Sequence, residues 1–501
     1  MGRDAVASPR WDGRTLSLPK DCVASATLDI DGIWFDDLRA GTEGDLQLAL
    51  AYSPSGCRAF TPTLRRTRDG AILWPCAGAD AASVSMVCDS HDDGAVLVDA
   101  QAQPMAARVA IVVPVYNAPA AVRRCLDSVL VHSSGRARLI VIDDASPDAD
   151  IGPLLARYVG LPGVEVLSNP RNLGFTATAN RGIEAAGRDD VVLLNADTEV
   201  GPNWLTGLRR AAHARADIAT ATAVSDNAGA FSVPELEREN PPPSVWTHAQ
   251  TARAFWQHAG HAYPMLPTGN GFCMYVRRAV FDAVGMLDAA AFPQGYGEEN
   301  DFCQRASAKG LRHAIAGTVF VHHARSLSFG VARREELGRA GMRVLRERWP
   351  RYESDVGATL FSHERRVLDW RIRRLYAQAP MRPLPLPRVA LIDARGRARE
   401  THDGDVWHVA TQAGVLAYTD ACGDLDARIP PIGSTAAEIA HWLEREAIEL
   451  VDVREAADAR LADVLASESQ RLGIAVIAAG DADTDYSNAW QALRSFPELP
   501  A

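Results

Sequence analysis

The stretch that most constrains the fold covers residues 191–200, VVLLNADTEV, in which an apolar run ends in polar and acidic residues. A short apolar run bounded by charge is typical of a strand buried in a parallel sheet. Open α/β sheets bind ligands beyond the carboxyl ends of such strands. Asn195 and Asp197 alternate along the expected strand, so we predict that both side chains point to one face. Their oxygen atoms suit Mg²⁺ or Mn²⁺, although short acidic strand ends also occur without a function.

From residue 108 onward, strands alternate with helices, which predicts an α/β fold with a mostly parallel sheet. Strands are expected at 108–115, 139–142, 164–167, 191–194, 217–224, 271–276 and 318–321. Helices are expected at 119–131, 174–186, from Pro202 onward and across 331–378. The polar stretch 225–245 is long enough to form a lid or a binding segment.

A second acidic cluster, GYGEENDFCQRA at 295–306, contains Glu298, Glu299 and Asp301 in the first turn of a predicted helix. The helix dipole favours negative charge there, so an ordinary helix start explains the cluster as well as a reactive carboxylate does. His322 and His323 directly follow the predicted strand at 318–321. Because neighbouring strand residues point to opposite faces, only one of these histidines can face a site.

The two ends of the chain differ from this central pattern. Before residue 105, short apolar runs at 32–35, 71–75, 83–87 and 95–98 are separated by Asp-Gly turns, which predicts a small β-rich domain. Its Trp34 and Trp74 fit core aromatics better than a platform on which a sugar could stack. The proline-rich segment 380–387 predicts a stiff linker. Beyond it we expect a Rossmann-like unit with strands at 388–392, 448–453 and 474–478, a helix capped at Thr435 and another ending near Arg471. This unit has no GxGxxG loop, so we expect no cofactor there.

These patterns predict five segments. They are a β-rich domain at 1–105, the central α/β domain at 106–330, an arginine-rich helical extension at 331–380, a linker at 381–387 and the Rossmann-like domain at 388–501. The arginines of the extension could contact an anionic membrane surface, or they could form a solvated face paired with the interleaved glutamates.

Overall composition excludes several classes of protein. The net charge of −11 argues against nucleic-acid binding. The eight cysteines are scattered without a CxxC pair, which indicates reduced thiols rather than a disulfide framework or a zinc site. We find no apolar core of a signal peptide and no run of about 18 apolar residues. We therefore expect a cytoplasmic protein, soluble or peripheral on the inner face of the plasma membrane.

Seven segments together resemble a family 2 glycosyltransferase of the GT-A fold, over residues 108 to 330. They are AIVVPVYNAPAAVRRCLDSVL, LIVIDDASPD, NPRNLGFTATANRGIEAA, LLNADTEVGPNWL, GNGFCMYVRRAVFDAVGMLD, GYGEENDFCQRA and VFVHHARSLSFG. The Asn-x-Asp pattern in place of Asp-x-Asp is similar to the rhamnosyltransferase-like branch of bacterial surface-polysaccharide enzymes, such as those of O-antigen synthesis. The last domain weakly resembles half of a GT-B glycosyltransferase.

The resemblance implies roles for individual residues. The residues implied to bind the donor are Pro114, Tyr116 and Asn117 beside the nucleotide, Asp143 and Asp144 at the base and ribose, and Arg171. Asp197 matches the metal-binding aspartate, whereas Asn195 departs from the stricter pattern and could serve the ribose instead. Glu299 matches the catalytic base. His323 matches a histidine that faces the metal, with His322 as the alternative.

The implied function is a metal-dependent, inverting transfer of a hexosyl or deoxyhexosyl group. The donor would be a nucleotide sugar such as dTDP-rhamnose or a UDP-sugar, the cofactor Mn²⁺ or Mg²⁺, and the acceptor a growing cell-surface glycan, free or lipid-linked. The alternative is an inactive scaffold that binds a glycan or a nucleotide sugar. A pyrophosphorylase would need a glycine-rich, lysine-bearing phosphate loop after the first strand, and VPVYNAPAAVRR contains none.

Overall fold

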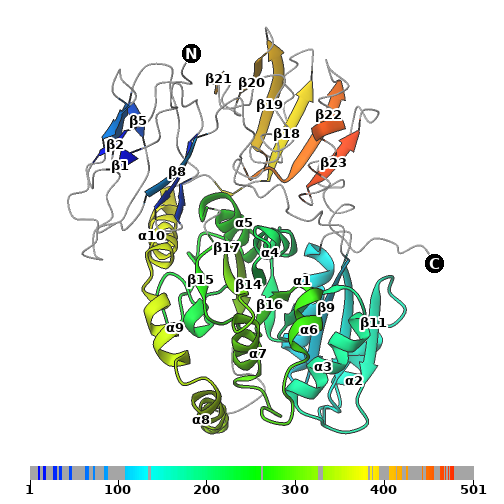
Figure 1. Ribbon diagram of the computed structural model, residues 1–501. Coiled ribbons are helices and arrows are strands. Elements are labelled where there is room, and N and C mark those ends of the chain that lie inside the picture. Colours follow the sequence, from blue (N-terminus) through cyan, green and yellow to red (C-terminus); the bar gives the residue numbers. More distant parts are fainter. Residues whose placement is uncertain are drawn as a thin grey trace.

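The computed structural model describes residues 108–133, 137–260, 263–324, 331–381, 384–385 and 387–393. Before and after these ranges it describes separate strands and a few further residues (Figure 1). The predicted strand at 95–98 and the predicted helix start at Thr435 lie outside the described residues.

The central sheet has nine strands among the described residues, in the order β11-β10-β9-β12-β16-β14-β17-β13, with β15 beside β17. Their bounds are β9 (Val109–Val115), β10 (Ala137–Asp143), β11 (Val164–Ser168), β12 (Asp190–Leu194), β13 (Thr198–Val200), β14 (Ile218–Val224), β15 (Met265–Leu266), β16 (Cys273–Val276) and β17 (Arg312–His323). Strands β9, β10, β11 and β12 are mutually parallel, and β14 is parallel to β17. Because β16 is antiparallel to both β12 and β14, six strands run the same way, and the predicted mostly parallel α/β sheet is confirmed.

Helices cover both faces of this sheet. They are α1 (Pro119–His132), α2 (Ile151–Ala156), α3 (Phe175–Ala186), α4 (Trp204–His213), α5 (His248–His258), α6 (Arg278–Val284) and α7 (Glu298–Ser307). Along β9, Val109, Ile111 and Val113 pack with α1, α2, α4 and α5, whereas Ala110 and Val112 pack with α3, α6 and α7. Successive strand residues thus supply two apolar cores, as the two-residue repeat of a strand requires.

Three helices follow the sheet, namely α8 (Val331–Arg348), α9 (Tyr352–Leu360) and α10 (His363–Gln378), and a short 3₁₀ turn covers Ala379–Met381. Some of their arginines form the expected solvated pairs, such as Arg346 with Glu353. Arg365, by contrast, is fully buried, where it pairs with Asp369 and donates to the carbonyls of Ala230 and Ser232. None of the described helices is both long and apolar enough to cross a membrane.

The described strands on either side form smaller sheets. N-terminal strands make one sheet from β1 (Arg10–Trp11), β2 (Thr15–Ser17), β7 (Ala71–Leu73), β6 (Thr63–Arg66) and β5 (Asp45–Gln47), and another from β4 (Ile33–Phe35), β3 (Ala26–Ile30) and β8 (Val84–Cys88). C-terminal strands are β18 (Arg388–Asp393), β19 (Asp405–Gln412), β20 (Val415–Thr419), β21 (Leu425–Asp426), β22 (Leu450–Glu455) and β23 (Ala475–Ala478). The three strands expected after the linker correspond to β18, β22 and β23.

The C-terminal unit contacts helices α4 and α5 of the central domain through buried polar groups. Trp256 donates its indole N–H to the carbonyl of Ala447 at 3.2 Å. Arg210 donates to the carbonyl of Leu472 at 3.2 Å and lies over the Trp256 ring. Arg253 pairs with the buried Glu449 at 3.1 Å. Helices α4 and α5 therefore form an interface with residues 447–472, which lie about 200 positions or more later in the sequence.

The structure differs from the sequence predictions at the end of β12. Asn195 and Asp197 lie in a turn between β12 and β13, so the prediction that they alternate along one strand is wrong. The hydroxyl and the backbone N–H of Thr198 both donate to the Asn195 carbonyl, at 2.7 and 3.3 Å, and this closes the turn. Helix α4 likewise begins at Trp204, two residues after the expected start at Pro202, because Asn203 adopts a left-handed conformation before it.

Candidate functional site

The carboxyl ends of β9 and β10 carry an unusual backbone. Asn117, Ala118 and Ala145 all have positive φ angles, of 59°, 56° and 53°. This region is disfavoured for residues with a Cβ, and such conformations gather at functional sites. Hydrogen bonds join the two strand ends, because Asn117 N–H donates to Ser146 Oγ and Ser146 N–H donates to Asp143 Oδ1. Pro114 in β9 and the half-buried Tyr116 lie at the same edge of the sheet.

Asp144 organises the neighbouring segment 169–174. Its carboxylate is buried and accepts hydrogen bonds from the backbone N–H groups of Leu173 and Gly174 and from the Asn169 amide, at 2.7–3.0 Å. Arg171 is exposed within this segment. Asp144 therefore shapes the loop that presents Arg171, and donor contact remains a prediction for Asp143, Asp144 and Arg171.

His323 and Asp197 face each other across the sheet edge, with His323 Nε2 at 3.3 Å from Asp197 Oδ1. The other ring nitrogen, Nδ1, lies 3.0 Å from the carbonyl oxygen of Asn227. A carbonyl can only accept a hydrogen bond, so Nδ1 carries the proton in the neutral ring, and Nε2 presents a lone pair to the carboxylate. Phe272 stacks on the ring, with 5.2 Å between centroids, and fixes its orientation. In that neutral form two electron-pair donors meet with no proton between them, which is an arrangement that a cation would stabilise.

The donor set therefore fits a divalent metal. Within the described ranges, no group of three or more His, Cys, Asp or Glu side chains is arranged to hold a metal ion. Ions such as Mg²⁺ commonly use one or two protein ligands and complete their shell with substrate phosphates and water. The pair of Asp197 and His323 agrees with a site of this kind, in which the protein supplies two ligands. The amide of Asn195 lies in the same turn, two residues before Asp197.

His322 points away from Asp197 and bonds Asp226 through Nδ1. This hydrogen bond raises the pKa of His322. Burial raises the pKa of Asp226, but the hydrogen bonds that it accepts from His322 and from the backbone N–H of His323 outweigh burial, and the net shift is downward. Of the two histidines, His323 is the one that faces Asp197.

Glu298 and Glu299 open helix α7 as the sequence predicted. Burial raises the pKa of Glu298 well above its usual range, and the charge of Glu299 raises it further. Burial also raises the pKa of Glu299, whose Oε2 has no hydrogen-bond partner among the described residues. Two adjacent carboxylates in such an environment cannot both ionise easily, so Glu298 retains its proton and Glu299 is the member of the pair that ionises first and is free of a proton to act as a base.

The segment Asn270–Phe272 connects these groups. The backbone N–H of Gly271 forms a hydrogen bond with the Glu299 carboxylate. This bond lowers the pKa of Glu299 and so offsets part of the increase that burial causes. The carbonyl of Phe272 accepts a hydrogen bond from Asn195 N–H, and its ring stacks on His323. One short stretch therefore contacts the Asp197 turn, the histidine and the acidic helix start.

Sequence reasoning missed Asp226, Asn227 and Phe272. Asp226 follows the buried strand β14 in the way that Asp197 follows β12, so an acidic residue just beyond an apolar run was an available signal. The role of Asn227 depends on its backbone carbonyl, which no side-chain pattern reveals.

Residues 110–285 match the protein family described as "Glycosyl transferase family 2". Asp143, Asp144, Arg171, Asn195 and Asp197 lie within this match, whereas Glu299 and His323 lie beyond it.

Several curated proteins are similar to parts of the chain. The "Succinoglycan biosynthesis protein ExoO" of Rhizobium meliloti is 32% identical over 125 residues, which cover 25% of this chain and 34% of that protein. The "Uncharacterized glycosyltransferase YibD" of Escherichia coli is 32% identical over 97 residues, which cover 19% of this chain and 27% of that protein. The "Putative glycosyltransferase EpsH" of Bacillus subtilis is 26% identical over 110 residues, which cover 22% of this chain and 32% of that protein. The chain thus spans about a third of the length of these relatives or less.

Among solved structures, the mannosyltransferase PcManGT from Pyrobaculum calidifontis in complex with GDP-Man and Mn²⁺ has a TM-score of 0.36 and 16% identity, with 56% of this chain and 77% of that one covered. This similarity is too low to support an argument about function. Residues 110–285 are therefore similar to family 2 glycosyltransferases, and the curated relatives ExoO and YibD are similar to parts of the same chain.

Proposed function

We propose that the protein transfers a sugar from a nucleotide-sugar donor to a hydroxyl group of a glycan, with inversion at the anomeric carbon. The family match supports the glycosyltransferase class. The observation that carries the metal-dependent form of this proposal is the contact between His323 Nε2 and Asp197 Oδ1 at 3.3 Å, in which the neutral ring would present a lone pair to the carboxylate.

Asp197 and His323 would hold Mn²⁺ or Mg²⁺, which when bound supplies Lewis-acid stabilisation of the departing diphosphate. Two neighbouring residues orient His323 for this role. Asn227 fixes the proton on His323 Nδ1, and Phe272 restrains the ring. Such groups around a ligand typically change metal affinity by about 10- to 100-fold when they are removed.

The donor nucleotide would lie against the carboxyl ends of β9 and β10. Pro114, Tyr116 and Asn117 lie at this edge, where ligands of open α/β sheets bind. A carboxylate such as Asp143 can accept a hydrogen bond from a pyrimidine N–H or a ribose hydroxyl. Arg171, which is exposed on the loop that Asp144 anchors, would contact the nucleotide.

Glu299 would act as the general base. As the acceptor oxygen bonds the anomeric carbon, the bond from that carbon to the phosphate oxygen breaks, the proton moves to Glu299 and the nucleoside diphosphate departs. One base and one displacement, on the face opposite the leaving group, give inversion. General-base catalysis of this kind contributes about 10²–10⁴-fold to the rate.

The narrower assignments are also proposals. Asn195 in place of a first aspartate favours the rhamnosyltransferase-like branch, with dTDP-rhamnose or a UDP-sugar as donor. The relative ExoO is named for succinoglycan biosynthesis, which supports a growing surface glycan, free or lipid-linked, as acceptor. Such a reaction would take place in the cytoplasm, with peripheral contact at the inner face of the plasma membrane.

The test is metal removal. Release of UDP or dTDP from UDP-glucose and dTDP-rhamnose should cease in excess EDTA and return when Mn²⁺ or Mg²⁺ is added beyond the chelator. Full release in excess EDTA would reject the metal-dependent mechanism. The same assay without acceptor would separate an enzyme from a scaffold that only binds the donor.

A further inference from the structure

The loop that leads into helix α7 has a backbone that requires external support. Gly295, Tyr296 and Gly297 have consecutive positive φ angles of 87°, 63° and 144°. Glycine tolerates this region, but tyrosine does so only at an energetic cost. Glu298 and Glu299 follow immediately, so the contacts that hold this loop also determine where the two carboxylates lie.

Helix α8 provides such contacts through its backbone and its apolar side chains. A Cβ atom on Gly341 would lie 1.8 Å from the carbonyl oxygen of Tyr296, so only glycine lets the helix approach this closely. One turn later, Leu345 packs in an apolar cluster with Phe292 and with Tyr352 of α9. Gly338, three residues before Gly341, has nothing within 4 Å of its own Cβ position.

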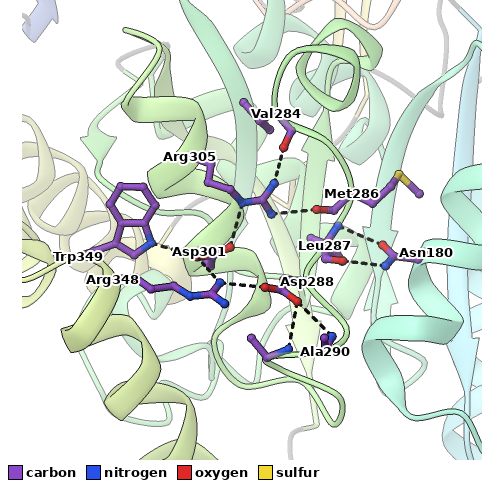
Figure 2. A network of polar contacts seen from close by, with 11 residues as sticks. Asn180, Val284, Met286, Leu287, Asp288, Ala290, Asp301, Arg305, Arg348 and Trp349 are labelled. Atoms are coloured by element: carbon purple, nitrogen blue, oxygen red, sulfur yellow. Dashed lines mark hydrogen bonds and ion pairs between the residues drawn. The ribbon is translucent and has the colours of Figure 1, made fainter.

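The end of α8 also binds α7 through Asp301, a buried residue two positions after Glu299 (Figure 2). Asp301 Oδ1 accepts hydrogen bonds from Trp349 Nε1 at 3.0 Å and from Arg348 Nη1 at 3.2 Å. Its Oδ2 accepts from Arg305 Nε at 2.9 Å. Arg348 reaches Asp288 as well, at 2.9 Å, and so connects the loop after α6 with the first turn of α7.

We propose that Arg348, Trp349 and Gly341 are positioning residues for Glu299, acting through Asp301 and through the loop 295–297. This inference rests on the function proposed above, because it assumes that Glu299 is the base. Helices α7 and α8 both lie beyond residues 110–285, so the catalytic unit extends past the segment matched to the family. The arginine-rich extension thus has a role in the reaction as well as a solvated surface.

The first experiment removes the polar contacts without changing the apolar packing. In Arg348→Met and Trp349→Phe, Asp301 loses one hydrogen bond each, whereas the control Arg346→Met removes an exposed ion pair of the same helix. Turnover is measured as UDP or dTDP release from UDP-glucose and dTDP-rhamnose, and affinity is measured as calorimetric Kd for UDP and dTDP with Mn²⁺. We expect a tenfold or larger loss of turnover in the double variant Arg348→Met/Trp349→Phe, with Kd changed less than twofold. The conservative variant Arg348→Lys should retain more turnover than Arg348→Met, because lysine can still donate to Asp301.

The second experiment uses the two glycines as a matched pair. Gly341→Ala should force α8 away from the Tyr296 carbonyl and lower turnover at least tenfold, whereas Gly338→Ala should leave turnover unchanged. Equal turnover in both variants, or a parallel loss of nucleotide affinity and turnover in the polar variants, would contradict the positioning role. The polar variants keep the test decisive if Gly341→Ala does not fold.

A double-mutant cycle with Glu299→Gln distinguishes failure of this inference from failure of the proposed function. If the contacts act through Glu299, Arg348→Met/Trp349→Phe should lower the residual turnover of Glu299→Gln by less than twofold. An equal tenfold loss in both backgrounds would reject positioning while leaving Glu299 as the base. A fully active Glu299→Gln variant would instead reject the base assignment, and the positioning role with it.

Discussion

Single residues decide the chemistry at the edge of the sheet, and neighbours in sequence differ sharply. His322 and His323 are adjacent in β17, yet one bonds Asp226 and the other faces Asp197. Glu298 and Glu299 are adjacent in α7, yet Glu298 bonds the backbone N–H of Gly297, while one oxygen of Glu299 lacks a partner among the described residues. In both pairs, the structure gives the two neighbouring side chains different partners.

The acidic pair yields a prediction about binding and chemistry. Glu299→Gln keeps the side-chain shape but cannot accept a proton, so turnover should fall by about 10²–10⁴-fold with nucleotide affinity nearly unchanged. Asp197→Ala should weaken both nucleotide affinity with Mn²⁺ and turnover. Glu298→Gln is the control and should cost much less, because a protonated Glu298 resembles glutamine. Steady-state kinetics and calorimetry measure these effects, and an inactive Glu298→Gln beside an active Glu299→Gln would reverse the assignment.

A dependence of activity on pH follows from the same burial. The base must be ionised to accept a proton, and burial raises the pKa of Glu299 above the usual glutamate value. Turnover should therefore decline as pH falls through this raised pKa, at a higher pH than an exposed glutamate of pKa about 4.3 would give. The profile of kcat against pH measures this limb. An acid limb that persists unchanged in Glu299→Gln would assign it to another group.

Among whole elements, α10 depends on a buried charge. Arg365 pairs with Asp369 and donates to two carbonyls of the loop 225–245. Arg365→Leu leaves Asp369 without its cation and should lower the free energy of unfolding by about 3–5 kcal/mol. The double variant Arg365→Leu/Asp369→Leu should recover much of this loss, and the exposed Arg351→Leu should have an effect within about 0.5 kcal/mol. Denaturant titration measures all three. Equal effects of Arg351→Leu and Arg365→Leu would contradict this role.

The elements also show what sequence patterns reveal. Strands β9, β10, β12 and β14 were predictable because short apolar runs bounded by polar residues are typical of strands buried in a parallel sheet. Helix α5 was missed although Thr247 and Gln250 form a capping box, because its apolar residues are sparse. The antiparallel pairing of β19 with β20 was missed as well.

Site residues follow a similar division. Asp197, His323 and Glu299 were named from motif order, and the structure places His323 against Asp197 and Glu299 at the start of α7. The turn at Asn195 was not predicted, and it is closed by two hydrogen bonds that the hydroxyl and the backbone N–H of Thr198 donate to the Asn195 carbonyl. The hydrogen bond from Arg348 to Asp301 was not predictable either, because it joins residues 47 positions apart in the sequence. Contacts set by tertiary packing carry no local signature.

At the scale of the whole molecule, the proline-rich segment still predicts a domain boundary, but buried contacts cross it. A chain ending at Ala379 should fold and bind UDP or dTDP with Mn²⁺, with a lower melting temperature because Trp256 and Arg210 lose their hydrogen bonds to Ala447 and Leu472. Arg253→Ala should destabilise the full chain, where Glu449 is its partner, and have little effect on the shortened one. Thermal unfolding measures both. An insoluble shortened chain would show that the last domain is required for folding.

The central claim is that Asp197 and His323 hold a divalent metal beside the donor, and electron spin-echo spectroscopy of bound Mn²⁺ tests it most directly. With UDP or dTDP present, the wild-type protein should show a nitrogen coupling from one imidazole. His322→Ala should retain this coupling, whereas His323→Ala should lose it. Absence of nitrogen coupling in the wild type, or its persistence in His323→Ala, would contradict the account.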